Sequence, residues 1–160
     1  TTLVTQNVDG LLETAGAANS IRLHGSVWHL RCGTPCASGR IDWPDATAPL
    51  PSLPPRCPHC GALARPAVVW FGEPLPVEPW ERAVRAASAA DVCLTIGTSA
   101  AFYPPASLLP LAKRHGAFIA EINLDTSAAT SLVDSAVRGG AETVLPELDA
   151  ILDRLGRSGA

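Results

Sequence analysis

The sequence contains no methionine, no apolar run of membrane-spanning length and no cluster of basic residues. Its start also lacks the charged and then apolar plan of a signal peptide, so nothing indicates a membrane or secreted protein. Eleven of the twelve basic residues are arginines scattered along the chain, and the net charge is only −3, which gives no sign of a nucleic-acid surface. We therefore expect a cytoplasmic protein that contacts neither membrane nor nucleic acid directly.

The first residues also lack an initiator methionine. The stretch 1–5 is typical of a strand entered in mid-course, so we expect the chain to be a piece of a longer polypeptide. Its 160 residues, 47% of them apolar and 17% charged, suffice for one globular domain with a sizeable core.

Apolar strands alternate with amphipathic helices along most of the chain. The expected strands are 3–5, 20–23, 27–31, 67–71, 91–96 and 118–122, and the expected helices cover 10–14, 77–87, 104–115 and 148–155. Strands that are apolar on both faces and separated by helices predict an α/β fold, in which a parallel sheet has helices on both faces.

Four of the five cysteines form two close pairs, Cys32-x3-Cys36 and Cys57-x2-Cys60. Two such turns can each present two thiolates and together complete a tetrahedron around Zn²⁺. The prolines between the pairs exclude helix and central strand, so metal binding would supply the folding energy of this loop-rich insertion. Four protein ligands leave no open position, which predicts a structural zinc.

Two alternatives to this zinc site remain, namely simple surface thiols and a ligand set in which His59 replaces Cys36. Cys93 lies inside an apolar run and is expected to be a small buried hydrophobe.

Polar clusters follow three of the expected strands, at Gln6–Asp9, Gly97–Ser99 and Asn123–Asp125. Ligands of parallel α/β sheets lie beyond the carboxyl ends of the strands. Gly97 would let a ligand approach the backbone, and the two hydroxyl residues after it could bind ribose or phosphate oxygens. The alternative for each cluster is an ordinary turn or helix cap.

His24 also lies at a strand end, on the same side as Asn7 and Asp9. An imidazole there suits a general base near neutral pH. A lone histidine before a glycine is more often structural, and that is the alternative.

Six blocks occur in order along the chain: Thr5-Gln6-Asn7-Val8-Asp9, Leu23-His24-Gly25-Ser26, the two cysteine pairs, Val68-Val69-Trp70-Phe71-Gly72-Glu73, Gly97-Thr98-Ser99 and Asn123. In this order they resemble the sirtuin family over essentially the whole chain. The segment 65–73, with Tyr103-Pro104, is most similar to the branch that includes bacterial deacylases and desuccinylases.

The resemblance implies a Rossmann-like NAD-binding domain, residues 1–30 and 67–160, with a small zinc-binding module, residues 31–66, inserted in it. It implies two cofactors, NAD and one structural Zn²⁺, and acyl-lysine proteins or peptides as partners. The implied activity is the NAD-dependent removal of acetyl or succinyl groups from protein lysines, which yields nicotinamide and O-acyl-ADP-ribose.

The resemblance also assigns roles to residues. His24 would be the general base that activates a ribose hydroxyl. The cofactor-binding residues would be Gln6, Asn7, Asp9, Gly97, Thr98, Ser99, Asn123, Leu124 and Ala141. The substrate-binding residues would be Val69, Phe71, Gly72, Glu73 and Tyr103, where an extended peptide adds a strand, although core packing is the alternative for Val69 and Phe71. The metal ligands would be Cys32, Cys36, Cys57 and Cys60.

The glycine-rich, Arg-containing loop of sirtuins, and the Tyr and Arg that select succinyl groups, would precede Thr1. We therefore expect residues 1–160 alone to bind NAD poorly. The preference between acetyl and succinyl groups remains open. The competing interpretations are a catalytically incomplete module that holds an acyl-peptide and a zinc-ribbon nucleic-acid module. The latter is disfavoured by the acidic pI of about 5.7 and by the lack of a cluster of basic residues around the cysteines.

Overall fold

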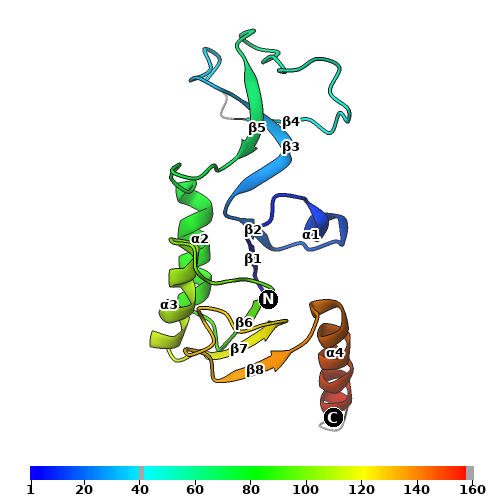
Figure 1. The fold of residues 1–160 in the computed structure, drawn as a ribbon, viewed down its shortest axis with the longest axis vertical. Helices are drawn as coiled ribbons and strands as arrows, with labels where there is room; N and C mark the ends of the chain where they lie inside the picture. The colour runs from blue at the N-terminus through cyan, green and yellow to red at the C-terminus, as the bar shows by residue number, and fades with distance from the viewer. Residues whose placement is uncertain (40–41, 158–160) are drawn as a thin grey trace. The chain divides into compact units, whose positions relative to one another are not determined.

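The computed structural model describes residues 1–39 and 42–157. The chain divides into two compact units, Thr1–Arg82 and Ala83–Ala160 (Figure 1). Helix α2 (Val77–Ser88) contains the boundary between them. Among the described residues, no helix is both long and apolar enough to cross a membrane.

The first unit begins with a small parallel sheet. Strands β1 (Leu3–Thr5) and β2 (Ser20–Arg22) pair in parallel, and α1 (Leu11–Thr14) lies in the connection between them. Both strands and the short helix are therefore confirmed. The apolar residues of 3–5 predict a buried strand, and this prediction is wrong. Leu3 and Val4, whose side chains point to opposite faces of the strand, are each 39% exposed, so neither face is fully covered.

The second sheet of this unit is antiparallel. Strand β3 (Gly25–Cys32) lies between β4 (Trp43–Pro44) and β5 (Ala64–Val68). A strand at Trp43–Pro44 was not expected from the prolines, but β4 is an edge strand, where the missing N–H of proline is tolerated. Leu30, Trp43 and Ala64 pack with two of the cysteines to form the core of this sheet.

Strand β5 covers 64–68 and not the expected 67–71. Arg65 and Pro66 pair with β3, whereas the chain turns after Val69. Gly72 has a φ of 86°, a left-handed conformation that ends the extended run.

The second unit is built on a parallel sheet with strand order β6-β7-β8, formed by Val92–Ile96, Phe118–Asn123 and Ser135–Arg138. A 3₁₀ turn, η1 (Pro105–Ser107), leads into α3 (Leu108–Arg114), which packs against β6 and β7. The core contains Leu109, Ala112, Ala117, Ile119 and Ala129. The α/β fold with parallel strands and helices is confirmed.

The sequence pattern missed part of this unit. Strand β8 was not expected, because its four residues lack an apolar run and become a strand by pairing with β7. The last helix, α4 (Ala141–Arg157), starts seven residues before the expected segment 148–155.

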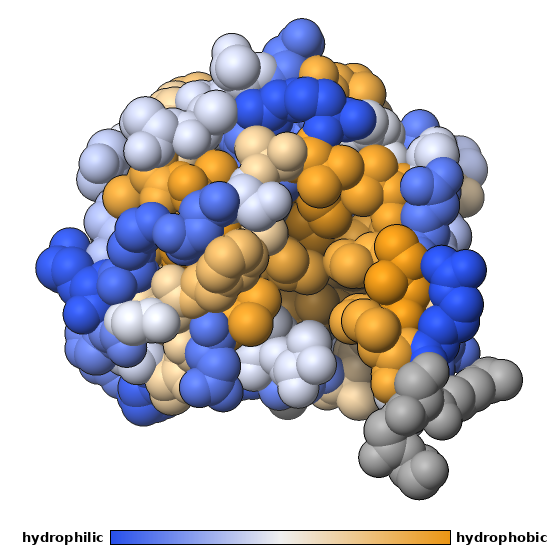
Figure 2. All heavy atoms as spheres, turned by 90° about the horizontal axis from the view of Figure 1, so that it is seen from below, coloured by the Kyte–Doolittle hydropathy of each residue, from blue (hydrophilic) through white to orange (hydrophobic). Residues whose placement is uncertain are grey.

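The expectation that β6 is buried on both faces is wrong. Val92, Leu94 and Ile96 are 59%, 44% and 38% exposed, whereas Cys93 on the opposite face packs against the core of the unit. Ile151 and Leu155 of α4 are also exposed. Figure 2 shows apolar surface gathered around a hollow on the face that it views. Burial raises the pKa of the Cys93 thiol, which fits its expected packing role.

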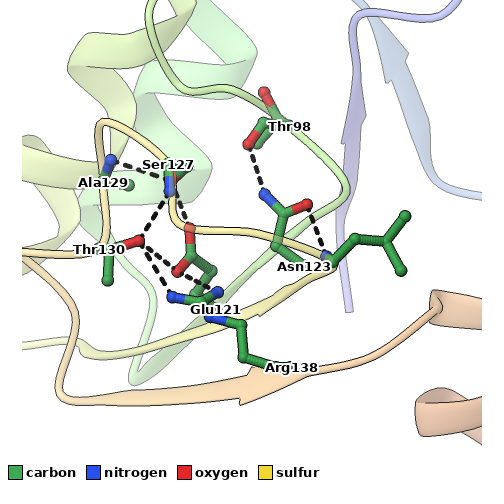
Figure 3. A network of polar contacts seen from close by, with 8 residues as sticks. Thr98, Glu121, Asn123, Ser127, Ala129, Thr130 and Arg138 are labelled. Carbon is green, nitrogen blue, oxygen red and sulfur yellow. Dashed lines mark hydrogen bonds and ion pairs between the residues drawn. The ribbon is translucent and has the colours of Figure 1, made fainter.

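A buried carboxylate organises the end of the second unit (Figure 3). Glu121 on β7 is only 1% exposed, and it accepts hydrogen bonds from Ser127 Oγ, from Thr130 Oγ1 at 2.7 Å and from the Arg138 guanidinium at 2.8 Å. Burial alone would raise the pKa of the Glu121 carboxyl, but the hydrogen bonds and the Arg138 charge outweigh burial and hold the pKa below its usual value. The carboxylate thereby ties the loop at 127–130 and strand β8 to strand β7.

We predict that Glu121→Gln lowers the free energy of unfolding at pH 7 by roughly 1.5–3 kcal/mol, the usual contribution of a hydrogen bond to a charged group. Because the folded-state pKa is depressed, the ionised carboxyl stabilises the fold above the unfolded-state pKa of about 4.3, and this stability is lost as pH falls through the folded-state value. Urea unfolding at pH 7, 5 and 3.5 should show the gap between wild type and variant narrowing at the lowest pH.

Glu147→Gln, which alters an exposed carboxyl of α4, is the matched control and should leave stability unchanged. A gap between wild type and Glu121→Gln that stays constant over this pH range would contradict the ionised network.

Candidate active site and metal centre

Four cysteine thiols converge in the first unit. The Sγ atoms of Cys32, Cys36, Cys57 and Cys60 all lie within 4.8 Å of one another. The Cys32–Cys60, Cys36–Cys60 and Cys36–Cys57 sulfur distances are 3.6, 3.6 and 3.8 Å. These distances are too long for a disulfide bond of about 2.05 Å. A tetrahedral Zn²⁺ with Zn–S bonds of about 2.3 Å places its sulfurs about 3.8 Å apart, so the cluster fits a zinc ion closely.

Backbone turns hold these thiols in place. Gly61 N donates to Cys57 O at 2.9 Å, Cys57 N donates to Ala62 O at 2.8 Å, and His59 N donates to Cys57 Sγ at 3.4 Å. A hydrogen bond with the Ser38 side chain lowers the pKa of Cys36 to about 6, which favours the thiolate that a metal requires.

His59 does not join the ligand cluster. Its ring packs edge-on against Trp43, with ring centroids 6.2 Å apart, and the converging groups in the described residues are the four cysteines. The alternative of a histidine ligand is therefore wrong, and scattered surface thiols are also excluded. Four sulfur ligands close the coordination sphere, so the arrangement fits a structural zinc site.

We predict one zinc ion per chain, and a loss of zinc affinity of about 100-fold or more in Cys57→Ser. Changes to groups that merely support a metal ligand already cost roughly 10–100-fold, and removal of a ligand should cost more. Zinc content after dialysis against a competing chelator, measured by mass spectrometry, checks this.

Cys93→Ser changes the one cysteine outside the cluster and should retain full zinc content. Equal zinc content in the two variants would contradict the assigned ligand set.

His24 lies where β2 passes into β3. Its neighbour Leu23 is only 1% exposed and donates its backbone N–H to Thr5 O at 3.0 Å, which fixes the backbone at this point. The His24 Nδ1 atom lies 3.2 Å from Gln6 O. A carbonyl oxygen can only accept, so in the neutral ring Nδ1 carries the proton and Nε2 keeps a lone pair. The ring can therefore act as a base at Nε2.

Strand β5 passes directly beside this histidine. Val69 N donates to His24 O at 3.0 Å, and Gly25 pairs with Val68. Gly25 has a φ of 76°, and a Cβ there would lie 2.0 Å from Ala67 O, so only glycine allows the two strands to approach this closely. Val69 is thus brought next to His24.

The loop that carries Gln6, Asn7 and Asp9 is fixed by contacts with strand β3. Val27 N donates to Val8 O at 3.0 Å, and the Trp28 indole N–H donates to Asp9 O. The Asp9 carboxylate also accepts the Leu11 N–H at 2.9 Å, at the start of α1. The structure therefore brings Gln6 into contact with His24, and it anchors the rest of the loop through Trp28. No sequence signal pointed to Trp28, because its partner lies nineteen positions away.

The remaining predicted residues of the first unit lie in the turn after β5. Phe71 is 96% exposed, Gly72 follows it, and Glu73 turns back towards the strand. A hydrogen bond from the Trp70 backbone N–H, and a second one from Arg65, hold the pKa of the Glu73 carboxyl below its usual value.

The other predicted cofactor residues lie in the second unit. Asn123 Nδ2 donates to Thr98 O at 2.9 Å (Figure 3). Gly97 N donates to Ile122 O at 3.0 Å. Gly97 has a φ of 58°, a conformation that favours glycine. The members of this group are Gly97, Thr98, Ser99, Asn123, Leu124 and Ala141, the last at the first position of α4.

Tyr103, also in this unit, is 76% exposed in the segment before η1. The predicted site residues thus fall into two groups, one within each unit.

Comparison with known proteins matches residues 1–104 to a family described as the Sir2 family. The chain is 47% identical over 146 residues to NAD-dependent protein deacylase 2 of Pyrobaculum aerophilum, which covers 91% of this chain and 57% of that protein. It is 41% identical over 158 residues to the NAD-dependent protein deacylase of Aquifex aeolicus, covering 98% of this chain and 64% of that protein. The chain thus spans about three fifths of the length of these curated relatives.

Solved structures agree with this match. A complex of a Sir2 homologue with NAD superposes with a TM-score of 0.90 at 42% identity, over 97% of this chain and 59% of that one. A Sir2Af2 structure bound to a myristoylated histone peptide superposes with a TM-score of 0.81 at 30% identity, over 99% of this chain and 67% of that one. The fold and the thiol cluster define a Rossmann-like α/β protein with a zinc-type cysteine centre. This chain belongs to the Sir2 family.

Proposed function

We propose that the protein is an NAD-dependent protein-lysine deacylase. The observation that carries the proposal is the junction at His24, where Nδ1 is held by Gln6 O, Nε2 is left as a base, and Val69 is bonded to the His24 backbone. This junction would put the base beside a strand end on which a peptide could pair. Relatives named NAD-dependent protein deacylases, at 41–48% identity, support it.

In the proposed reaction His24 takes a proton from a ribose hydroxyl through Nε2. The hydrogen bond from Nδ1 to Gln6 O would strengthen as the ring becomes positive, because charged donors form the stronger bonds. Asn7 and Asp9 would line the ribose and nicotinamide pocket, on a loop already fixed to β3. When NAD is bound, it supplies the ribose that accepts the acyl group.

In the second unit, Gly97, Thr98 and Ser99 would bind the phosphate and ribose side of NAD. The hydrogen bond from Asn123 to Thr98 O supports this, because it fixes the loop after β6 relative to the end of β7. Leu124 and Ala141 would lie near the adenosine. The NAD complex among the structural neighbours supports the choice of cofactor.

The substrate would be an acyl-lysine peptide laid along Val69–Glu73 as an added strand, with Phe71 against the acyl-lysine. Tyr103 is a further residue that we propose for substrate binding. The myristoylated histone peptide in one structural neighbour supports this class of substrate. The acyl group would be acetyl, succinyl or both.

We also propose residues 31–66 as a small zinc-binding module within an NAD-binding domain formed by 1–30 and 67–160.

We predict that His24→Ala lowers the rate of O-acyl-ADP-ribose formation by about 100-fold or more, because a general base usually contributes at least this factor to the rate. The assay incubates the protein encoded by the complete reading frame with NAD and acetyl- or succinyl-lysine peptides, and detects the product by mass spectrometry. The two peptides also rank the acyl preference.

His115→Ala removes an exposed histidine of the second unit and should retain wild-type activity. Activity retained in a folded His24→Ala variant would overturn the assigned role. Peptide binding without any turnover in the wild-type protein would instead indicate an acyl-peptide-binding module.

A further inference from the structure

The guanidinium of Arg65 connects β5 to the turn that follows it. One terminal nitrogen donates to Val68 O at 2.9 Å, and the other donates to Glu73 Oε1 at 2.6 Å. The guanidinium carbon also lies 4.0 Å from the centroid of the Trp70 ring. Only 18% of the Arg65 side chain is exposed, so these contacts are partly shielded from water. One side chain thereby bonds the strand end, the carboxylate after the turn and the aromatic ring within it.

Glu73 closes the same turn from the other side. Its Oε2 accepts the Trp70 N–H at 3.1 Å, and its own N–H donates to Trp70 O at 3.0 Å. The carboxylate therefore uses one oxygen for the Arg65 side chain and the other for the turn backbone. Arg65, Trp70 and Glu73 form one connected set of contacts, which we name the Arg65 clamp.

The residues held by the clamp are those that the proposed function gives to the substrate. Val69 N is bonded to His24 O, and Phe71 lies at the exposed apex of the turn. A turn that had to become ordered when a peptide arrived would reduce the binding affinity. A turn already fixed relative to His24 avoids this loss.

We propose that Arg65 is a positioning residue, which through the Arg65 clamp holds the Val69–Gly72 turn in the conformation that receives an acyl-lysine peptide. The inference rests on the proposed deacylase function. Lysine cannot replace this arginine, because an ammonium group lacks the planar fork that bonds a carbonyl and a carboxylate while stacking on an indole. The clamp acts on the peptide and not on the chemistry at His24.

The test compares Arg65→Lys with wild type in the protein from the complete reading frame. Peptide affinity is measured by calorimetry with an acetyl-lysine peptide, and kcat and the KM for NAD are measured in the same assay. We expect the peptide Kd to rise about 10-fold, with kcat and the KM for NAD changed by less than about 2-fold. Hydrogen exchange at the Trp70 and Glu73 amides should accelerate, while zinc content stays at the wild-type level.

Two further variants sharpen the test. Arg82→Lys is the matched control and should behave as wild type, because it changes a half-exposed arginine on α2 whose ion pair is with Glu78. Glu73→Gln should weaken peptide binding as Arg65→Lys does. The double variant should be worse by less than the sum of the two single effects, because the two changes share the contact between Arg65 and Glu73.

An unchanged peptide Kd in Arg65→Lys would overturn the positioning role, as would a fall in kcat with unchanged Kd or a loss of zinc. A wild-type protein that binds the peptide but does not turn it over would refute the deacylase function alone, and the Kd comparison would still decide on the clamp. A wild-type protein that neither binds nor turns over the peptide would refute both.

Discussion

The antiparallel pairing of β3 with β5 is the constraint on which the first unit depends. At one end of this ladder Gly25 pairs with Val68, beside His24, and at the other end Cys32 pairs with Ala64, within the thiol cluster. The proposed base and the metal centre therefore lie at opposite ends of the same two strands. A zinc ion would stabilise the loops at the Cys32 end of this ladder. Through the two strands it would also stabilise the position of His24 without contacting it.

The close approach at Gly25 also sets where the turn after β5 begins. Because Val69 is bonded to the His24 backbone, the first residue of the turn has a fixed place relative to the imidazole. The contacts of Arg65 and Glu73 then hold the following residues of the turn in a fixed conformation. The rigid elements are the strands, and the residues proposed for the substrate lie in the few positions just beyond them.

Strand β7 has the corresponding role in the second unit. Glu121 and Asn123 are two positions apart, so they lie on the same face of the strand. Glu121 holds the 127–130 loop and Arg138, while the Asn123 side chain holds the Thr98 backbone (Figure 3). The Asn123 backbone carbonyl also accepts the Gly139 N–H. Polar residues at the carboxyl end of one buried strand thus organise the loops after β6, β7 and β8.

The sequence by itself determined the fold class, the four cysteines as the favoured ligand set and most helices and strands, whereas the structure excluded His59 as a ligand. Apolar periodicity reports which segments are covered, and cysteine spacing reports which turns can share a metal, because both depend on residues close together in the chain. Only the tertiary structure decided that Pro44 and Arg138 belong to strands, since each pairs with a strand that is distant in sequence. It alone decided which way side chains point: Trp28 to Asp9, and Arg65 to Trp70 and Glu73. Such contacts depend on strand register and side-chain direction, which the order of residues along the chain does not express.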